Sequence, residues 1–152
     1  MNRSIKAAAI ALVAAALVSP GFAQDARVAQ QQVKLRQAVY TVLGTHFSQM
    51  GAMVQGRMPY DAATFRTAAE RVAFMATIAP DVFPQGSLTS NSKAKPELWQ
   101  QQAEFQRLMK DMQTKVTALA TTARGGDLEA IKPAFGATGA SCKACHDKYK
   151  AD

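Results

Sequence analysis

Cysteine and histidine are scarce in this 152-residue chain, which contains only two of each. A structural zinc site needs four ligands, and the cysteines and histidines offer Cys142, Cys145, His146 and His46. Neighbours such as Cys145 and His146 point about 100° apart on a helix, so these side chains suit a tetrahedral zinc site poorly. A disulfide between Cys142 and Cys145 would close a very small loop and constrain little chain entropy. A zinc site and a disulfide scaffold are therefore both poor explanations of the cysteine pair.

The chain also lacks sustained alternation of polar and apolar residues, so we predict no β-strands. Apolar residues recur instead at helical spacing in four segments: residues 25–54, 61–79 and 96–123, and a last one that begins at Asp127. Residues 80–96 are rich in Pro, Gly, Ser and Asn and form a long loop, which often marks a functional segment. We predict an all-α fold, an antiparallel up-down-up-down four-helix bundle.

Each predicted helix has an apolar stripe that we expect to face the core. Pro133 and Gly136 are awkward inside the last helix, so we expect a kink there or a helix that begins near Ala137. The first segment carries two neighbouring stripes, and each other segment carries one: Val28, Gln32, Leu35, Val39, Val42, His46, Met50 and Met53 beside Arg36, Tyr40, Leu43 and Phe47; Phe65, Ala69, Val72 and Ala76; Phe105, Leu108, Met112, Val116 and Leu119; and Leu128, Ile131, Phe135, Cys142, Cys145 and Tyr149.

Long hydrophobic runs are missing except at the N-terminus. Arg3 and Lys6 precede an apolar run over residues 7–18, and small residues follow at Gly21 and Ala23. The run is shorter than the ~20 residues that cross a bilayer, and the pattern is typical of a secretory signal peptide. We expect cleavage after Ala23, which gives a signal peptide over residues 1–23 and a bundle over residues 24–152 that does not insert into a membrane. The alternative is an uncleaved N-terminal anchor.

The formal net charge is +7, and loss of Arg3 and Lys6 with the signal peptide lowers it to +5. A basic protein can bind nucleic acid or an anionic surface. The Lys and Arg residues are scattered, however, and no three of them are consecutive. We therefore expect a solvated basic surface and no nucleic-acid partner.

The cysteines belong to the run Cys142-Lys143-Ala144-Cys145-His146, the C-x-x-C-H pattern of c-type haem attachment. Residues three apart lie on one face of a helix, so two thiols can add to the two vinyl groups on one porphyrin edge. His146 follows directly and can reach the iron as its axial ligand. The dithiol of an oxidoreductase competes with this interpretation, but it lies at a helix N-terminus, whereas this motif lies deep in a helix with no strand before it.

With this motif at the end of four helices, the sequence resembles the cytochrome c′ family over essentially the whole mature chain. The matching parts are Arg36-Gln37, the run Pro59-Tyr60-Asp61-Ala62-Ala63, the run Lys95-Pro96-Glu97-Leu98-Trp99, and residues 135–147 around the haem motif. Mitochondrial-type cytochromes c place the motif near the N-terminus, so the order of the elements argues against them.

The resemblance implies one covalent haem c with high-spin, five-coordinate iron and His146 as its single protein ligand. It also implies a periplasmic location, a homodimer, and binding of NO or CO on the open side of the iron. In the family, the positions of Arg36 and Gln37 contact the haem propionates, and the loop before the third helix touches the haem, which makes Lys93 a possible contact. Many members have Arg where this chain has Lys150, and Lys lacks the planar fork of the guanidinium.

Tyr40 lies one turn beyond Arg36 on the same helix face, so it lies near the iron if Arg36 holds a propionate. Low-spin relatives carry Met at this position, whereas a neutral phenol with a reference pKa near 10 is a poor iron ligand. Met50 is roughly 15 Å further along the helix at 1.5 Å per residue, Met53 is further still, and His46 is rotated by about 240°. We therefore predict an open sixth position with Tyr40 in the distal pocket.

Two functions share this scaffold: binding of diatomic gases, and electron transfer with an unidentified redox partner. A low-spin electron carrier with a filled sixth position is the alternative of the same family. A peroxidase would need acid–base groups beside bound peroxide, and no His or carboxylate lies near Tyr40 along its segment, so we do not expect an enzyme. A haem-free helical bundle with a redox dithiol remains the last alternative.

Overall fold

The computed structural model describes residues 20–151, with side chains from residue 24 onward. The predicted signal peptide therefore lies outside the described residues, apart from the backbone of residues 20–23. The first helix, α1 (Pro20–Val54), begins before the predicted cleavage point.

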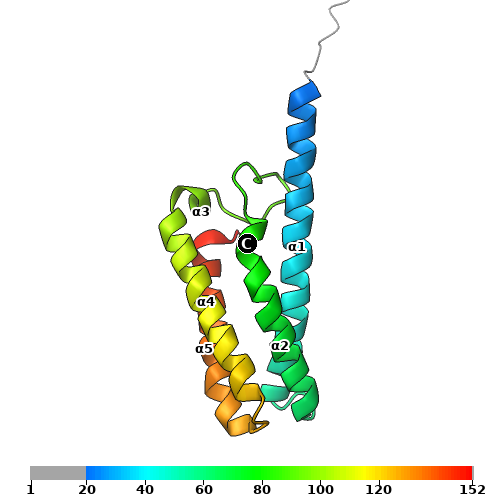
Figure 1. Ribbon diagram of the computed structural model, residues 1–152, viewed down its shortest axis with the longest axis vertical. Helices are drawn as coiled ribbons and strands as arrows, with labels where there is room; N and C mark the ends of the chain where they lie inside the picture. Colours follow the sequence, from blue (N-terminus) through cyan, green and yellow to red (C-terminus); the bar gives the residue numbers. More distant parts are fainter. Residues whose placement is uncertain (1–19, 152) are drawn as a thin grey trace, which may run out of the picture.

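Four long helices form the bundle (Figure 1). After α1, the chain turns into α2 (Ala62–Ile78), which continues into the 3-10 helix η1 (Ala79–Val82). The short α3 (Glu97–Gln100) and the long α4 (Gln102–Ala123) follow the loop, and α5 (Leu128–Tyr149) completes the bundle. Successive long helices run in opposite directions, which confirms the predicted all-α bundle. No helix of this part of the chain is long and apolar enough to span a membrane.

The third predicted segment is not one helix, because the chain leaves the helical conformation at Gln101 (φ −112°, ψ 45°). Side chains on both sides of Gln101 are tied to other elements. The indole N–H of Trp99 donates to the carbonyl oxygens of Phe83 and Pro84, each at 3.1 Å. The hydroxyl of Tyr149 donates to Oε1 of Gln101 at 3.1 Å. Tertiary bonds thus accompany the break, and the local sequence contains no Gly or Pro to signal it.

The last helix is continuous through Pro133, so the predicted late beginning near Ala137 is wrong. Pro133 lies in the second turn of α5 and removes one backbone N–H, whose partner would have been the carbonyl of Glu129. Glu129 is exposed, so water can solvate that carbonyl. The N-terminus is also capped, because the Asp127 carboxylate accepts the N–H of Glu129 at 2.9 Å. A first turn stabilised in this way tolerates the proline.

The predicted apolar stripes of α2 and α4 are fully buried in the core. The first stripe of α1 is wrong in part. Its members Val39, Met50 and Met53 are buried, but three others are between 43% and 49% exposed: Val28, Leu35 and Val42. These three lie seven residues apart on one line of α1. The stripe therefore includes both core residues and an exposed apolar line.

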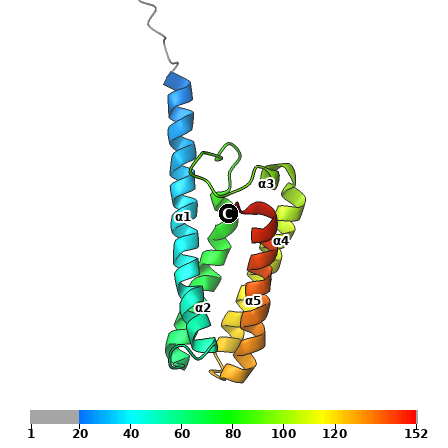
Figure 2. The ribbon, with the colours of Figure 1, turned by 180° about the vertical axis from the view of Figure 1, so that it is seen from behind.

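Pairs of helices pack unevenly in the bundle. Helix α1 packs mainly on α2, and α5 mainly on α4, whereas α1 and α5 touch sparingly. Figure 2 shows the ribbons of α1 and α5 drawing apart toward the C-terminal end of α5. We call the region between α1 and α5 the α1–α5 seam. Its closed end lies at Phe47 and Phe135, whose rings stack with centroids 4.4 Å apart.

Candidate haem site

Cys142 and Cys145 lie on the last third of α5, at the open end of the seam, and both are half-buried. The two cysteines are free thiols with no disulfide between them. Burial raises the pKa of both thiols, and that of Cys145 reaches about 11, with the Cys142 thiol adding to the effect of burial. A redox dithiol needs a lowered thiol pKa, since the thiolate is its nucleophile. The environment of these cysteines therefore disfavours the dithiol hypothesis.

His146 follows in the last turn of α5 and is exposed. Partial burial of the imidazole lowers the pKa of His146, and the Lys150 ammonium lowers it further. The Asp147 carboxylate opposes both effects by raising the pKa. A neutral imidazole is the form that binds a metal, so this shift favours a ligand role. Among the described residues, no group of three or more His, Cys, Asp or Glu side chains could hold a metal ion. His146 therefore has no companion ligands for a site such as zinc.

Tyr40 projects from α1 toward the cysteines. Its pKa is raised, first by burial and then by the thiols of Cys145 and Cys142, while Arg36 lowers it. The effect of both thiols on the phenol indicates that Tyr40 lies near the cysteines, and its place in a distal pocket stays a prediction. The Tyr40 hydroxyl donates to Sδ of Met109 on α4 at 3.9 Å, and the phenol is protonated at neutral pH.

Aromatic rings line the site beside Tyr40. The ring of Phe83 lies edge-on to Tyr40 with centroids 5.9 Å apart and to Phe105 at 5.1 Å, and Phe105 meets Tyr149 at 5.6 Å. Such apolar walls suit the face of a porphyrin. Phe105 and Tyr149 belong to predicted stripes, but sequence reasoning missed Phe83 and Met109. Phe83 lies in a loop without periodicity, so no sequence signal pointed to it.

Arg36 is 7% exposed and fastens the loop after η1 to α1. Its Nε donates to the carbonyl of Val82 at 2.9 Å, Nη1 to Oγ of Ser92 at 2.9 Å, and Nη2 to Oγ and the carbonyl of Ser87 at 2.5 and 3.4 Å. Its guanidinium carbon also lies 4.5 Å from the centroid of the Phe83 ring, within the range of a cation–π contact. All three guanidinium nitrogens thus bind the end of η1 or the loop that follows it, and the propionate contact stays a prediction.

The remaining predicted contacts lie around the same loop. Gln37 donates from Nε2 to the carbonyl of Asn91 at 3.1 Å. The N–H of Lys95 donates to the carbonyl of Tyr149, and the N–H of Ala151 to the carbonyl of Lys93, both at 2.8 Å. These two bonds form an isolated antiparallel bridge between Ala94 and Lys150. The bridge brings the backbones of Lys93 and Lys150 close together, next to the turn that carries His146.

The residues excluded as ligands lie elsewhere. Met50 and Met53 are buried in the core. His46 lines a shallow pocket of about 280 Å³ between α1 and α2, together with Arg71 and Gln49. The structure therefore does not bring these side chains to the cysteines.

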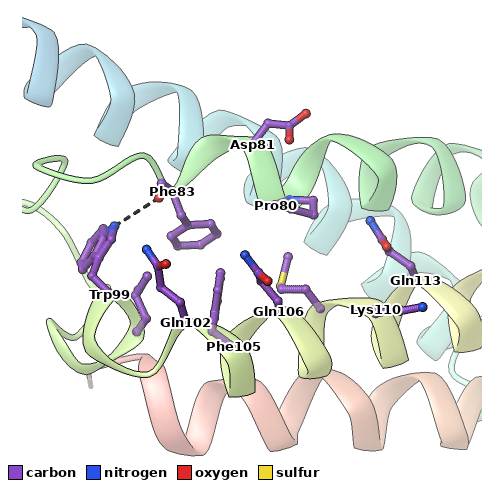
Figure 3. Close-up of a pocket in the computed structure, with 11 residues that line it drawn as sticks. Pro80, Asp81, Phe83, Trp99, Gln102, Phe105, Gln106, Lys110 and Gln113 are labelled. Carbon is purple, nitrogen blue, oxygen red and sulfur yellow. Dashed lines mark hydrogen bonds between the residues drawn. The ribbon is translucent and has the colours of Figure 1, made fainter.

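A larger pocket of about 480 Å³ opens between η1, α3 and α4 (Figure 3). Phe83 and Phe105 point into it, and Trp99 closes one end, with its indole N–H bonded to the Phe83 carbonyl. Met109 contributes to its lining as well. Phe83 and Met109 therefore both line this pocket and contact Tyr40.

The chain matches known proteins over this whole region. Residues 31–150 match the family model described as cytochrome C′. The chain is 36% identical over 121 residues to the cytochrome c′ of Alcaligenes xylosoxydans, an alignment that covers 80% of this chain and 94% of that protein. It is 30% identical over 146 residues to a cytochrome c-554 of Cereibacter sphaeroides, covering 93% of this chain and 95% of that protein.

Solved structures give the same result. The cytochrome c prime of Shewanella frigidimarina superposes with a TM-score of 0.79 at 40% identity, covering 82% of this chain and 97% of that one. A ferrous variant of the protein from Alcaligenes xylosoxidans, solved with NO bound, superposes with a TM-score of 0.76 at 35% identity, covering 82% and 96%.

Proposed function

The chain belongs to the cytochrome c′ family and carries covalent haem c, and from that premise we propose that it binds NO and CO at an open position of a high-spin, five-coordinate iron. The observation that carries the proposal is Tyr40. The position that faces the cysteines from α1 holds a protonated phenol, whose hydroxyl is already bonded to Met109. Relatives from Alcaligenes xylosoxidans have been solved as NO complexes, which supports the same chemistry here.

Different residues of the chain would attach the haem, bind its iron and line the distal pocket. Cys142 and Cys145 would hold the porphyrin through thioether bonds, and His146 would supply its imidazole to the iron. The haem supplies an iron that binds diatomic gases and changes between Fe(III) and Fe(II). Tyr40 would limit the space for a ligand, and the rings of Phe83 and Phe105 would form an apolar wall beside it. The same scaffold permits electron transfer with an unidentified redox partner.

An optical spectrum of the ferrous protein with and without CO tests this proposal. We expect a high-spin spectrum that CO changes. A Tyr40→Ala variant should bind CO more tightly, since it removes the bulk on the distal side, and an exposed neighbour on α1, Thr41→Ala, should not. A sharp six-coordinate spectrum that ignores CO would replace the proposal with a low-spin electron carrier.

We infer that the protein acts without catalysing a reaction. The Tyr40 side chain contacts the Met109 thioether and the Phe83 ring, and neither is a suitable acid–base group for peroxide cleavage. Peroxidase activity above that of free haem would contradict this inference.

We also propose export to the periplasm, with cleavage after Ala23, because haem is attached to such motifs outside the cytoplasm. The intact mass of the purified protein checks both parts at once. It should equal residues 24–152 plus one haem. A mass that retains residues 1–23 would favour the uncleaved anchor.

A homodimer is the final part of the proposal. Val28, Leu35 and Val42 form an exposed apolar line on α1, and a second copy packed along it would remove that surface from water. Leu35→Glu should convert the dimer to a monomer in analytical ultracentrifugation. Leu88→Glu is the matched control, since Leu88 is 45% exposed in the loop. A wild-type monomer at high concentration would contradict the dimer.

A further inference from the structure

Met109 lies on α4, 3% exposed, and its sulfur accepts the hydroxyl of Tyr40 at 3.9 Å. The Tyr40 ring is held separately by Phe83, which meets it edge-on. Two neighbours on different elements thus fix the ring and the hydroxyl of the same side chain. The distal residue of this site is therefore held in place before any ligand binds.

The partner of the hydroxyl matters because a phenol has a single O–H donor. That donor stabilises a polar ligand on the iron only if it points to the ligand. While it points to a thioether, which is a weak acceptor, a gas on the iron meets the bulk of the ring and receives no hydrogen bond. The Met109 sulfur therefore decides whether a ligand meets only the bulk of the Tyr40 ring or also receives a hydrogen bond from its hydroxyl.

Met109 differs in this respect from its neighbour in the core. Met112 is buried one turn further along α4, and its sulfur accepts no hydrogen bond within residues 24–151. Both side chains fill the core equally well, but Met109 alone of the two meets a donor. Packing therefore accounts for a methionine at both positions, and the contact with Tyr40 distinguishes one of them.

We propose that Met109 is a positioning residue that holds the Tyr40 hydroxyl away from the distal ligand, so that the site selects ligands by size and not by hydrogen bonding. This inference rests on the proposed gas-binding function. Met109→Leu, which nearly conserves volume, should free the hydroxyl to donate to bound CO. The C–O stretching frequency should fall, and CO release should slow by about two- to tenfold, the range of a neutral hydrogen bond.

A double-mutant cycle identifies the donor. Tyr40→Phe keeps the ring but removes the hydroxyl, so Met109→Leu should change neither the frequency nor the release rate in that background. Met112→Leu is the matched control and should have no effect in either background. An equal effect of Met109→Leu with and without the hydroxyl would overturn the proposal and assign the effect to packing.

A second measurement detects the contact between Met109 and Tyr40 directly and does not depend on the affinity for a ligand. In protein labelled at the methionine methyl groups, the NMR resonance of Met109 should move on Tyr40→Phe, while that of Met112 should stay in place. The ferrous CO complex is diamagnetic and suits the experiment, and a six-coordinate ferrous protein would suit it without CO. An unmoved Met109 resonance overturns the inference even if CO binds, whereas failure of CO to bind overturns the proposed function and leaves this test valid.

Discussion

The same two helices, α1 and α5, pack closely at one end of the α1–α5 seam and lie apart around the candidate site at the other end. At the closed end, Phe47 and Phe135 stack with centroids 4.4 Å apart, and a Cβ added at Gly51 would lie 3.3 Å from the Phe135 ring. At the open end, Tyr40 faces Cys142 and Cys145, and the neighbouring wall comes from other elements. Glycine and stacked rings bring the helices together at one end, whereas large side chains hold a site between them at the other.

This difference indicates how the fold can hold a large planar group without losing its packing. The closed end joins α1 to α5 directly, and the loop between η1 and α3 joins them at the other end through Arg36 and the bridge to residue 150. The region where α1 and α5 lie apart is therefore connected at both of its ends. Variants at each end should fail in different ways.

Loss of both thiols should have the largest effect, and only at the open end. We expect the double variant Cys142→Ser and Cys145→Ser to retain no covalent haem, because no thioether can form. Haem staining after denaturing electrophoresis measures this directly. Ala144→Ser, an exposed change inside the motif, should keep full staining. Haem that survives denaturation in the double variant would contradict the assigned attachment.

Phe135→Ala should disrupt the closed end. The variant loses an aromatic stack and leaves a cavity, which should cost about 2–4 kcal/mol of unfolding free energy. Urea denaturation measures this loss, while the haem spectrum should stay unchanged. The control is Phe74→Ala on α2, where the ring is 66% exposed and the expected change is below about 0.5 kcal/mol. An altered spectrum in Phe135→Ala would show that the two ends are coupled.

Arg36→Leu should release the loop at the open end. The carbonyls of Val82 and Ser87 would lose a charged donor, which should cost about 1–3 kcal/mol. Hydrogen exchange should accelerate at the N–H groups of Ser87 and Ser92, which are bonded within the loop. Gln37→Leu removes one exposed bond and should leave these rates nearly unchanged. Equal acceleration in both variants would contradict the central role of Arg36.

Substitution of two glycines of α1, Gly44 and Gly51, should have smaller effects on stability that differ with their distance from the closed end. A Cβ at Gly44 meets nothing within 4 Å, so Gly44→Ala should stabilise the helix by up to about 1 kcal/mol. Gly51→Ala should stabilise less, or destabilise, because its Cβ presses on Phe135. Thermal unfolding of the two variants gives the ordering. A larger gain for Gly51→Ala would mean that the closed end is loosely packed.

Acid should weaken the attachment of α5 to α4 slightly. Glu104 pairs with Arg107 and with Lys148, each at 2.7 Å, and these hydrogen bonds lower its pKa from 4.5 to about 2. Its stabilising effect is present above pH 4.5 and is lost as the pH falls toward 2. Glu104→Gln should therefore flatten the stability profile in that window only. An unchanged profile would mean that other carboxylates dominate acid unfolding.

The sequence was sufficient for the helices and for the haem cofactor, because both signals depend on spacing along one chain. Helical periodicity located α2 and α4 with their buried faces, and the C-x-x-C-H run indicated covalent haem. The second predicted segment begins at Asp61, whose carboxylate caps α2 by accepting the N–H of Thr64 at 2.7 Å.

Features that depend on pairs distant in sequence were not predictable. Arg36 bonds to residues 46 to 56 positions away, and a buried arginine that binds loop carbonyls has no local pattern. The break at Gln101 and the bond from Tyr40 to Met109 depend on tertiary contacts in the same way. The exposed line on α1 was mistaken for core because periodicity indicates that a face is apolar but does not identify what covers it.

The bridge between Ala94 and Lys150 has a consequence for truncation of the chain. Residues 149–151 directly follow the attachment motif, and Tyr149 and Ala151 make the two backbone hydrogen bonds to Lys95 and Lys93. Without residues 149–151, the extended segment at residues 93–95 lacks its partner, and the aromatic wall loses the ring of Tyr149. A C-terminal deletion from Tyr149 onward would therefore keep both cysteines and His146 but leave the loop without its attachment to the end of α5.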